Sequence, residues 1–188
     1  THAFVPFSTG DLTAFVLATG EPRWTQPAPT SFAPAADGTR VIVVSETSVQ
    51  AFRATDGEPL WRVPTPGVIV SAPVATSGWV VVALDSGQLR ALRAETGAQV
   101  WSTELEAIPS SAPVVAGDRL YVGVTGRVLA ALDVVSGARL WQAAFDGDVF
   151  FPDWPRAQFR LAESEARTST DGIGYHFNRY ERIGEPRR

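Results

Sequence analysis

The sequence predicts an all-β protein: a partial β-propeller of four-stranded repeats, followed by a C-terminal β-hairpin. Three observations predict this fold. A Gly-x-x-x-Trp pair recurs four times in register. Short runs of β-branched and aromatic residues are bounded by Gly, Asp and Ser, and no long window has an apolar face at helical spacing. Four short strands in each unit of about 40 residues are typical of propeller blades.

The most regular feature is a stretch that begins with Leu or Val and ends with Trp. Its four copies are Leu12 to Trp24, Val49 to Trp61, Leu89 to Trp101 and Leu129 to Trp141. Successive tryptophans are 37, 40 and 40 residues apart, and the glycines at 20, 57, 97 and 137 keep the same spacing. A pair held in register through four copies defines a repeat protein.

The internal order of each repeat is constant, and the third repeat shows it clearly. Ser71-Ala72-Pro73 opens the unit as its innermost strand, a Gly turn follows, and an apolar run and the Leu-x-Ala-Leu strand come next. A Thr-Gly or Ser-Gly turn then leads into the strand that carries Trp, and we expect its Gly to have a positive φ. We expect Trp61, Trp101 and Trp141 to be buried between blades, and Trp24 to matter less because its blade is incomplete.

The predicted boundaries divide the chain into propeller repeats over residues 1–142 and a tail over 143–188. The blades are expected at residues 3–27 (incomplete), 28–65, 66–105 and 106–143. The strands of the incomplete blade are Ala3 to Phe7, Leu12 to Leu17 and Pro22 to Thr25. Its innermost strand is expected before residue 1, and we interpret the chain, which has no initiator Met, as a fragment or a processed form.

The combined pattern Leu-x-Ala-Leu-x-x-x-Thr-Gly-x-x-x-Trp, preceded by Ser-x-Pro, resembles the pyrroloquinoline-quinone-type propeller repeat over residues 3–142. That family includes quinoprotein dehydrogenases and the lipoprotein scaffold of the outer-membrane protein assembly machine. The resemblance implies a propeller and export to the periplasm. It does not imply activity, because most proteins with these repeats bind no quinone.

The tail contains two alternating segments, Phe159 to Ala166 and Ile173 to Arg182, and we expect a hairpin with Thr168 to Gly172 as its turn. Residues 143–183 also resemble the C-terminal strands of dihydrofolate reductase. The catalytic part of that enzyme has no counterpart in residues 1–142, so no catalytic residue carries over. Alternatively, Val149 to Pro152 occupies the place of a next innermost strand, which would close a four-blade ring. We favour an open arc whose free edges self-associate or pair with blades that lie outside this chain.

Composition excludes several classes of function. The net charge is -4 and all 16 basic residues are Arg without a basic run, so we expect no nucleic-acid partner. The chain has no Cys, and its only histidines are His2 and His176, which excludes thiolate and His-rich metal sites. No apolar stretch approaches the roughly 18 residues of a membrane span. No signal-peptide pattern is visible at the start, so the compartment follows only from the resemblance.

Residues with the chemistry of a catalytic site are few, and we predict no catalytic, cofactor-binding or metal-binding residue. Quinone-dependent dehydrogenation, as the resemblance describes it, needs a Ca²⁺ held by Glu, Asn and Asp, yet the only Asn is Asn178 in the tail. His176 is expected on the surface of the hairpin. The acids of the repeats are expected to be turn residues: Asp11, Asp37, Asp56, Asp85 and Asp118.

Arg53, Arg90 and Arg93 lie on the Leu-x-Ala-Leu strands. They could form a positive patch for an acidic partner, and a solvent-exposed strand face is the preferred interpretation.

Three functions remain open at this stage. The preferred one is a non-enzymatic binding or assembly scaffold with a protein partner at the cell envelope. The second is a fragment of a quinoprotein oxidoreductase. The third is a reductase-like activity, which only the tail suggests.

Overall fold

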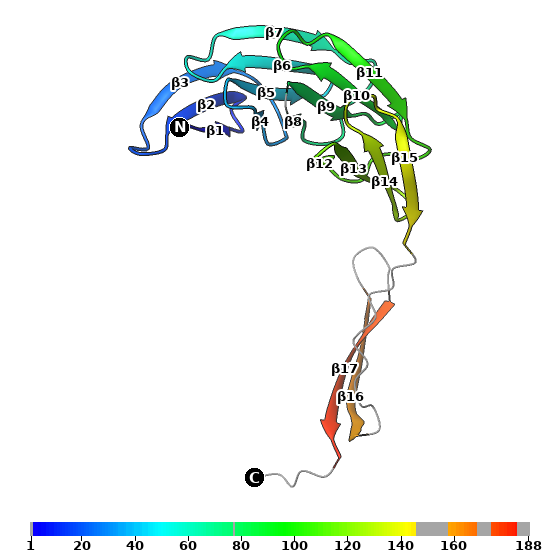
Figure 1. Ribbon diagram of the computed structural model, residues 1–188. Helices are drawn as coiled ribbons and strands as arrows, with labels where there is room; N and C mark the ends of the chain where they lie inside the picture. Colours follow the sequence, from blue (N-terminus) through cyan, green and yellow to red (C-terminus); the bar gives the residue numbers. More distant parts are fainter. Residues whose placement is uncertain (1, 77, 146–157, 169–173, 184–188) are drawn as a thin grey trace. The chain divides into compact units, whose positions relative to one another are not determined.

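The structure is a computed structural model that describes residues 2–76, 78–145, 158–168 and 174–183 (Figure 1). The chain divides into two compact units, Thr1–Asp146 and Gly147–Arg188, each described here by itself. Every described regular element is a β-strand.

The first unit holds four antiparallel sheets whose strands follow chain order. Sheet 1 consists of β1 (His2–Pro6), β2 (Asp11–Val16) and β3 (Pro22–Pro27). Sheet 2 consists of β4 (Ala35–Ala36), β5 (Arg40–Ser45), β6 (Ser48–Arg53) and β7 (Pro59–Pro64). Sheet 3 consists of β8 (Val74–Thr76), β9 (Trp79–Ala83), β10 (Gln88–Arg93) and β11 (Gln99–Glu104). Sheet 4 consists of β12 (Val114–Ala116), β13 (Arg119–Val124), β14 (Val128–Asp133) and β15 (Arg139–Ala144).

This architecture confirms the predicted partial propeller, with three four-stranded blades and one three-stranded blade among the described residues. The apolar clusters of the described residues join sheets 1 and 2, 2 and 3, and 3 and 4, and none joins sheet 4 to sheet 1, so the sheets do not close into a ring. Val149 to Pro152, the residues considered for ring closure, lie outside the described residues.

The continuous apolar runs arise because the inner sheets bury both of their faces. Successive strand residues point to opposite faces. In β5, Val41 and Val43 pack toward sheet 1 in one apolar cluster, whereas Ile42 and Val44 pack toward sheet 3 in another. A third cluster joins sheets 3 and 4 through Trp101 and Leu120. Three apolar layers therefore hold the four sheets together.

The same irregularity occurs in every sheet, next to the turn that precedes the Trp strand. The register between the last two strands shifts directly after an Ala: Ala14, Ala51, Ala91 and Ala131. Each of these alanines lies directly opposite the Trp of its sheet. A small residue there leaves room for the indole ring, and the shift is a β-bulge that increases the local twist.

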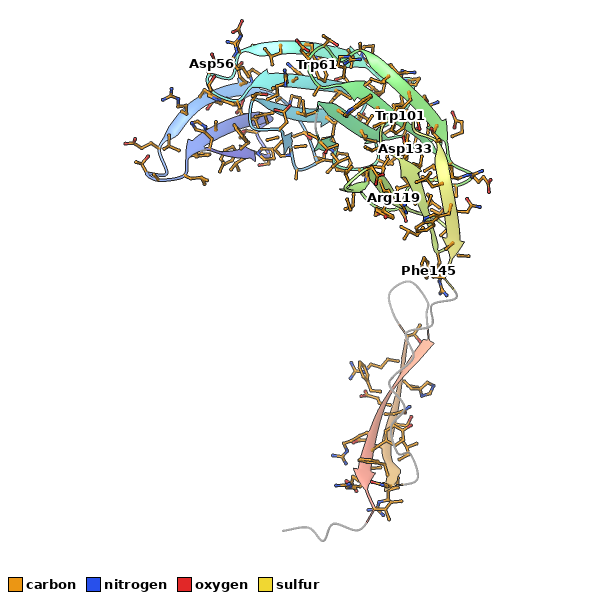
Figure 2. The ribbon with its side chains drawn as sticks, in the orientation of Figure 1. Asp56, Trp61, Trp101, Arg119, Asp133 and Phe145 are labelled. Atoms are coloured by element: carbon orange, nitrogen blue, oxygen red, sulfur yellow. The ribbon has the colours of Figure 1, made fainter. Side chains whose placement is uncertain are left out.

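Trp24, Trp61 and Trp101 each pack against the Gly turn of the following sheet. A Cβ on Gly97 would lie 2.7 Å from Cε3 of Trp61, and one on Gly137 would lie 2.5 Å from Cδ2 of Trp101. The Nε1–H of Trp61 donates to the carbonyl of Ala94 at 2.9 Å, and that of Trp101 donates to Val134 at 3.1 Å. Figure 2 labels Trp61 and Trp101 at successive positions along the row of sheets. The glycine is therefore required by the packed ring as well as by its positive φ of 72°.

Three expectations about the tryptophans need correction. Trp61 is half-buried rather than buried, although its ring covers Gly97. Trp141 is 39% exposed rather than buried, because no described sheet follows sheet 4. Trp24 makes the same contact as Trp61 and Trp101: its Nε1–H donates to Ala54 at 3.1 Å, and its ring covers Gly57. The incomplete sheet 1 lacks a strand distant from this contact, so Trp24 keeps its full packing partner.

The inner strands differ from the prediction by a few residues. β8 begins at Val74 and β12 at Val114, directly after the Ser-x-Pro segment instead of within it. Proline has no N–H to donate to a ladder, so regular pairing starts beyond it.

The second unit is the predicted hairpin. β16 (Phe159–Thr168) and β17 (Gly174–Arg182) pair antiparallel, with Phe159 opposite Arg182 and Thr168 opposite Gly174. Arg160 and Glu181 form an ion pair at 3.2 Å across the strands. Of the predicted turn, residues 169–172 lie outside the described residues.

The burial of the tryptophans predicts unequal effects of their removal. Trp101→Ala should lower the free energy of unfolding by about 3 to 5 kcal/mol, as large-to-small core substitutions do. Trp141→Ala should cost only about 1 to 2 kcal/mol, because its ring is already partly in solvent. Urea unfolding of both variants measures this difference, and equal losses would contradict the inter-sheet position of Trp101.

A second prediction separates the backbone requirement from the ring contact. Gly20 and Gly137 have φ values of 73° and 72°, but nothing lies within 4 Å of a Cβ placed on Gly20. Gly20→Ala should therefore lower the free energy of unfolding by only about 1 to 2 kcal/mol, the cost of placing Ala in a left-handed backbone conformation. Gly137→Ala should cost about 1 to 3 kcal/mol more, because its methyl group overlaps Trp101. Equal unfolding free energies would show that the ring contact adds nothing.

Candidate protein-binding surface

A row of side chains crosses each sheet and faces the next one. In sheet 3 the row consists of Val74, Val81, Ala91 and Trp101, which are paired neighbours across β8, β9, β10 and β11. Most of this row packs in the apolar cluster that joins sheets 3 and 4. The repeat thus presents one apolar row per sheet to the sheet that follows.

The matching row of sheet 4 has no described sheet against it. It consists of Val114, Tyr121, Ala131 and Trp141, which are again paired neighbours across the strands. We name these four residues the outer face. Val114 is 61% exposed, and the rings of Tyr121 and Trp141 contact each other with centroids 6.0 Å apart. Sheets 2 and 3 have Ile42 and Val81 where the outer face has Tyr121, so its central position is aromatic and carries a hydroxyl group.

Sheet 1 presents the complementary half of the repeated contact. Gly20 occupies the turn position of Gly57, Gly97 and Gly137, but no described atom lies within 4 Å of a Cβ placed on it. No Gly turn of the described residues packs against Trp141, and no Trp ring of the described residues packs against Gly20. The ends of the described row of sheets therefore lack the contact that joins the inner sheets.

Most of the acids expected in turns lie there: Asp56, Asp85 and Asp118 are in turns and Asp37 is in the β4–β5 connection, whereas Asp11 is the first residue of β2. Asp37 Oδ1 accepts from the backbone N–H groups of Thr39 and Arg40 at 2.9 and 2.8 Å. Asp85 Oδ1 accepts from the N–H of Val68 at 3.1 Å, which fixes the segment between sheets 2 and 3. Asp133 supports the last Ser-Gly turn in the same way. Figure 2 labels Asp56, which lies in a turn of sheet 2, and Asp133, the last residue of β14.

Their pKa values follow from these bonds. Burial raises the pKa of Asp37, but hydrogen bonds from Thr39 and Arg40 outweigh it and bring the pKa below its ordinary value. The hydroxyl and then the N–H of Ser136 lower the pKa of Asp133. A lowered folded-state pKa stabilises the fold above the pKa of the unfolded chain, and this contribution is lost as pH falls through the folded-state value. These carboxylates are therefore ionised structural acceptors at neutral pH.

The three arginines of the Leu-x-Ala-Leu strands are placed individually and do not meet as one patch in the contacts of the structure. Arg53 forms ion pairs with Asp56, at 3.0 Å, and with Glu58. Arg90 hydrogen-bonds to Gln99 of its own sheet, and its Nε is buried without a hydrogen-bond partner among the described residues. Arg93 is exposed. Arg53 and Arg93 thus support the preferred solvent-exposed interpretation, and Arg90 is partly buried.

The two histidines belong to different units of the chain. His2 lies in β1 near Phe4, with ring centroids 6.3 Å apart, and His176 is exposed on β17 opposite Ala166. Within the described residues, no group of three or more His, Cys, Asp or Glu side chains could hold a metal ion. The same residues include no helix with the length and apolar character of a membrane span.

A groove opens between the ends of sheets 1 and 2, with a volume of about 750 Å³. Its walls are the β1–β2 turn with Phe7, the linker from Pro29 to Phe32, and the β5–β6 turn from Val44 to Thr47. Sequence reasoning missed both this groove and the outer face. Signals for both were present: the 37-residue spacing between Trp24 and Trp61, and Tyr121 at a position that is aliphatic in sheets 2 and 3.

The fold and these surfaces define an open row of β-propeller blades. The family model of the outer membrane protein assembly factor BamB matches residues 1–67 and 45–149 of this chain. The chain therefore belongs to this family, which confirms the resemblance to pyrroloquinoline-quinone-type repeats. No curated protein sequence matches the chain.

Solved structures share the fold. BamB from Moraxella catarrhalis is 17% identical with a TM-score of 0.64, over 94% of this chain and 69% of that one. The computationally designed Ika8 protein is 14% identical with a TM-score of 0.68, over 94% of this chain and 55% of the design. A europium-containing methanol dehydrogenase is 12% identical with a TM-score of 0.64, over 76% of this chain and 39% of the enzyme. The chain thus spans about half or less of the latter two proteins.

The unmatched Trp and Gly predict self-association of the isolated chain. Trp141 of one copy can cover Gly20 of another, as Trp101 covers Gly137, and such head-to-tail contacts do not close on themselves. Sedimentation velocity should therefore show a mass that grows with protein concentration. Trp141→Arg should suppress this growth, whereas Leu60→Arg, at an exposed position on sheet 2, should not. A strictly monomeric species up to high concentration would contradict the prediction.

Proposed function

We propose that this protein is a non-enzymatic scaffold that binds protein partners at the bacterial cell envelope, in the periplasm or at the outer membrane. The observation that carries the proposal is the match of residues 1–149 to the outer-membrane assembly family. The placement of the acids supports it, because Asp37, Asp85 and Asp133 hold turns together instead of converging on one cavity. The domain division at 142/143 and the absence of site residues stay predictions.

The outer face is the binding surface that the geometry favours. Interface centres are enriched in Tyr and Trp, which bury a large area and keep a polar group for hydrogen bonding. Tyr121 and Trp141 provide both on a strand scaffold. The ion pair of Arg139 with Glu106, at 2.9 Å, lies on the other face of sheet 4, because Arg139 pairs with Leu132 of the cluster between sheets 3 and 4. The aromatic pair is therefore the feature of the outer face that matches the centre of a protein interface.

Rescue of outer-membrane assembly tests the proposal. The chain, exported to the periplasm of a bacterium that lacks its own member of this family, should increase the amount of folded outer-membrane β-barrel, measured by heat-modifiable migration on gels. Tyr121→Ala with Trp141→Arg should remove this gain, whereas Leu60→Arg should keep it. Equal levels with and without the chain, at equal periplasmic abundance, would contradict the proposed function.

The oxidoreductase alternative has a separate test. Titration of the purified chain with pyrroloquinoline quinone and Ca²⁺ should show no saturable change in the quinone absorbance. Stoichiometric binding would instead favour a dehydrogenase fragment. Tight NADPH or methotrexate binding, measured by calorimetry, would support the reductase resemblance of the tail, which stays a prediction.

A further inference from the structure

The linker into sheet 2 is shorter than the two linkers that follow it. The three linkers start at equivalent residues, because Ala28, Thr65 and Leu105 each donate a backbone N–H to the turn beside them, at 2.9, 2.9 and 2.8 Å. Pro73 follows Thr65 by eight positions and Pro113 follows Leu105 by eight, whereas Pro34 follows Ala28 by six. Two residues are therefore missing from the first linker.

The longer linkers use this length to add a short strand segment to the next sheet. Ile69 forms an antiparallel bridge with Leu84. Val70 N–H donates to the carbonyl of Ala83 at 3.0 Å, and Asp85 N–H donates to the carbonyl of Val68 at 2.9 Å. Ile69 is 2% exposed, so its side chain closes the gap between sheets 2 and 3.

The linker into sheet 4 does the same with a different sequence. Pro109 bridges Val124. Ser110 N–H donates to the carbonyl of Gly123, and Thr125 N–H donates to the carbonyl of Ile108, both at 2.9 Å. The segment is thus a repeated part of the fold and does not depend on particular side chains.

Sheet 2 lacks this segment. The groups that correspond to Ala83 C=O and Asp85 N–H are Val44 C=O and Glu46 N–H, and neither has a hydrogen bond to a described residue. The short linker instead turns on itself, because Thr30 Oγ1 accepts from Phe32 N–H at 3.0 Å and donates to Phe32 C=O at 3.2 Å. The groove of about 750 Å³ lies between this linker and the end of β5.

The lining of the groove specifies what it can hold. Phe7, 43% exposed, and Phe32 provide apolar surface for one side chain in the place that Ile69 fills one sheet further on. Glu46 is the only charged residue of the lining, and it is exposed. A Cβ on Gly67 would lie 2.8 Å from the carboxylate of Asp85, the counterpart of Glu46. In the groove, the position equivalent to Gly67 therefore lies beside Glu46, and a basic side chain there would balance the charge of Glu46.

We propose that this groove binds an extended segment of a partner protein, which pairs with the end of β5 as the longer linkers pair with sheets 3 and 4. The segment places a β-branched residue against Phe7 and Phe32, and an Arg or Lys two positions earlier against Glu46. Strand addition of this kind draws affinity from main-chain hydrogen bonds and selectivity from the side-chain pockets. The inference deepens the proposed protein-binding function by naming a site and the chemistry of its ligand.

The probe is a capped, fluorescein-labelled peptide Arg-Val-Ile-Val-Ser, which copies residues 67–71 with Arg in place of Gly67. Fluorescence anisotropy with the full chain should show saturable binding. The matched control carries an N-methyl group on its second valine, the counterpart of Val70, and thus loses one main-chain donor with its side chains unchanged. It should bind about fivefold or more weakly, the usual effect of one lost hydrogen bond. Equal affinity of the two peptides would overturn the strand pairing.

Two protein variants locate the site. Glu46→Arg should weaken the Arg probe, and a Glu-Val-Ile-Val-Ser probe should bind this variant better than the wild type. Replacement of residues 29–34 by the eight residues 66–73 should fill the groove with the chain's own segment and abolish binding. Binding that survives this replacement would place the peptide on an open sheet edge and overturn the proposal. If the variant with the replaced linker does not fold, Glu46→Arg and the two probes of opposite charge still test the proposal.

Binding of a synthetic peptide is independent of rescue in cells. Rescue by the chain without saturable peptide binding would overturn the groove proposal alone, and peptide binding without rescue would overturn the proposed function alone.

Discussion

The contact between a Trp ring and the Gly turn of the next sheet is the interaction on which the first unit depends. It joins sheets that share no ladder hydrogen bonds, and it does so three times, with Trp24, Trp61 and Trp101. The indole N–H finds a backbone carbonyl at each step, so burial of the ring leaves no polar atom unpaired. The glycine is doubly required, since its φ is positive and a Cβ would overlap the ring.

The remaining packing follows from this contact. Once each sheet lies against its neighbour, β5 and β9 are covered on both faces, which explains their uninterrupted Val and Ile runs. Stability is then largely a sum of neighbouring contacts along the row. Each end sheet has a single described neighbour, and so Trp141 has no Gly turn against it and Gly20 has no Trp ring against it among the described residues.

Function in such a scaffold resides where the repeats depart from one another. The turns and the Trp contacts are nearly invariant between blades, and the acids serve those turns. The departures are the aromatic pair of Tyr121 and Trp141 on the outer face and the short linker from Ala28 to Pro34. Each leaves surface that the other repeats cover with their own residues. Both proposals therefore concern sites where a contact that the other repeats make within the chain is missing.

The sequence alone determined the repeat, the strand order and the hairpin, because each depends on local pattern: β-branched runs, glycine turns and alternation over a few residues. The spacing of Gly and Trp also identified the family. What the pattern could not decide was burial, because exposure depends on the neighbouring sheet and not on the residue itself. Trp101 and Trp141 occupy the same position of the Gly-x-x-x-Trp motif, yet one is buried and the other is exposed. The groove could not be predicted from the sequence for the same reason. The first linker is two residues shorter than the others, and the effect of this difference is visible only because the longer linkers pair with sheets 3 and 4.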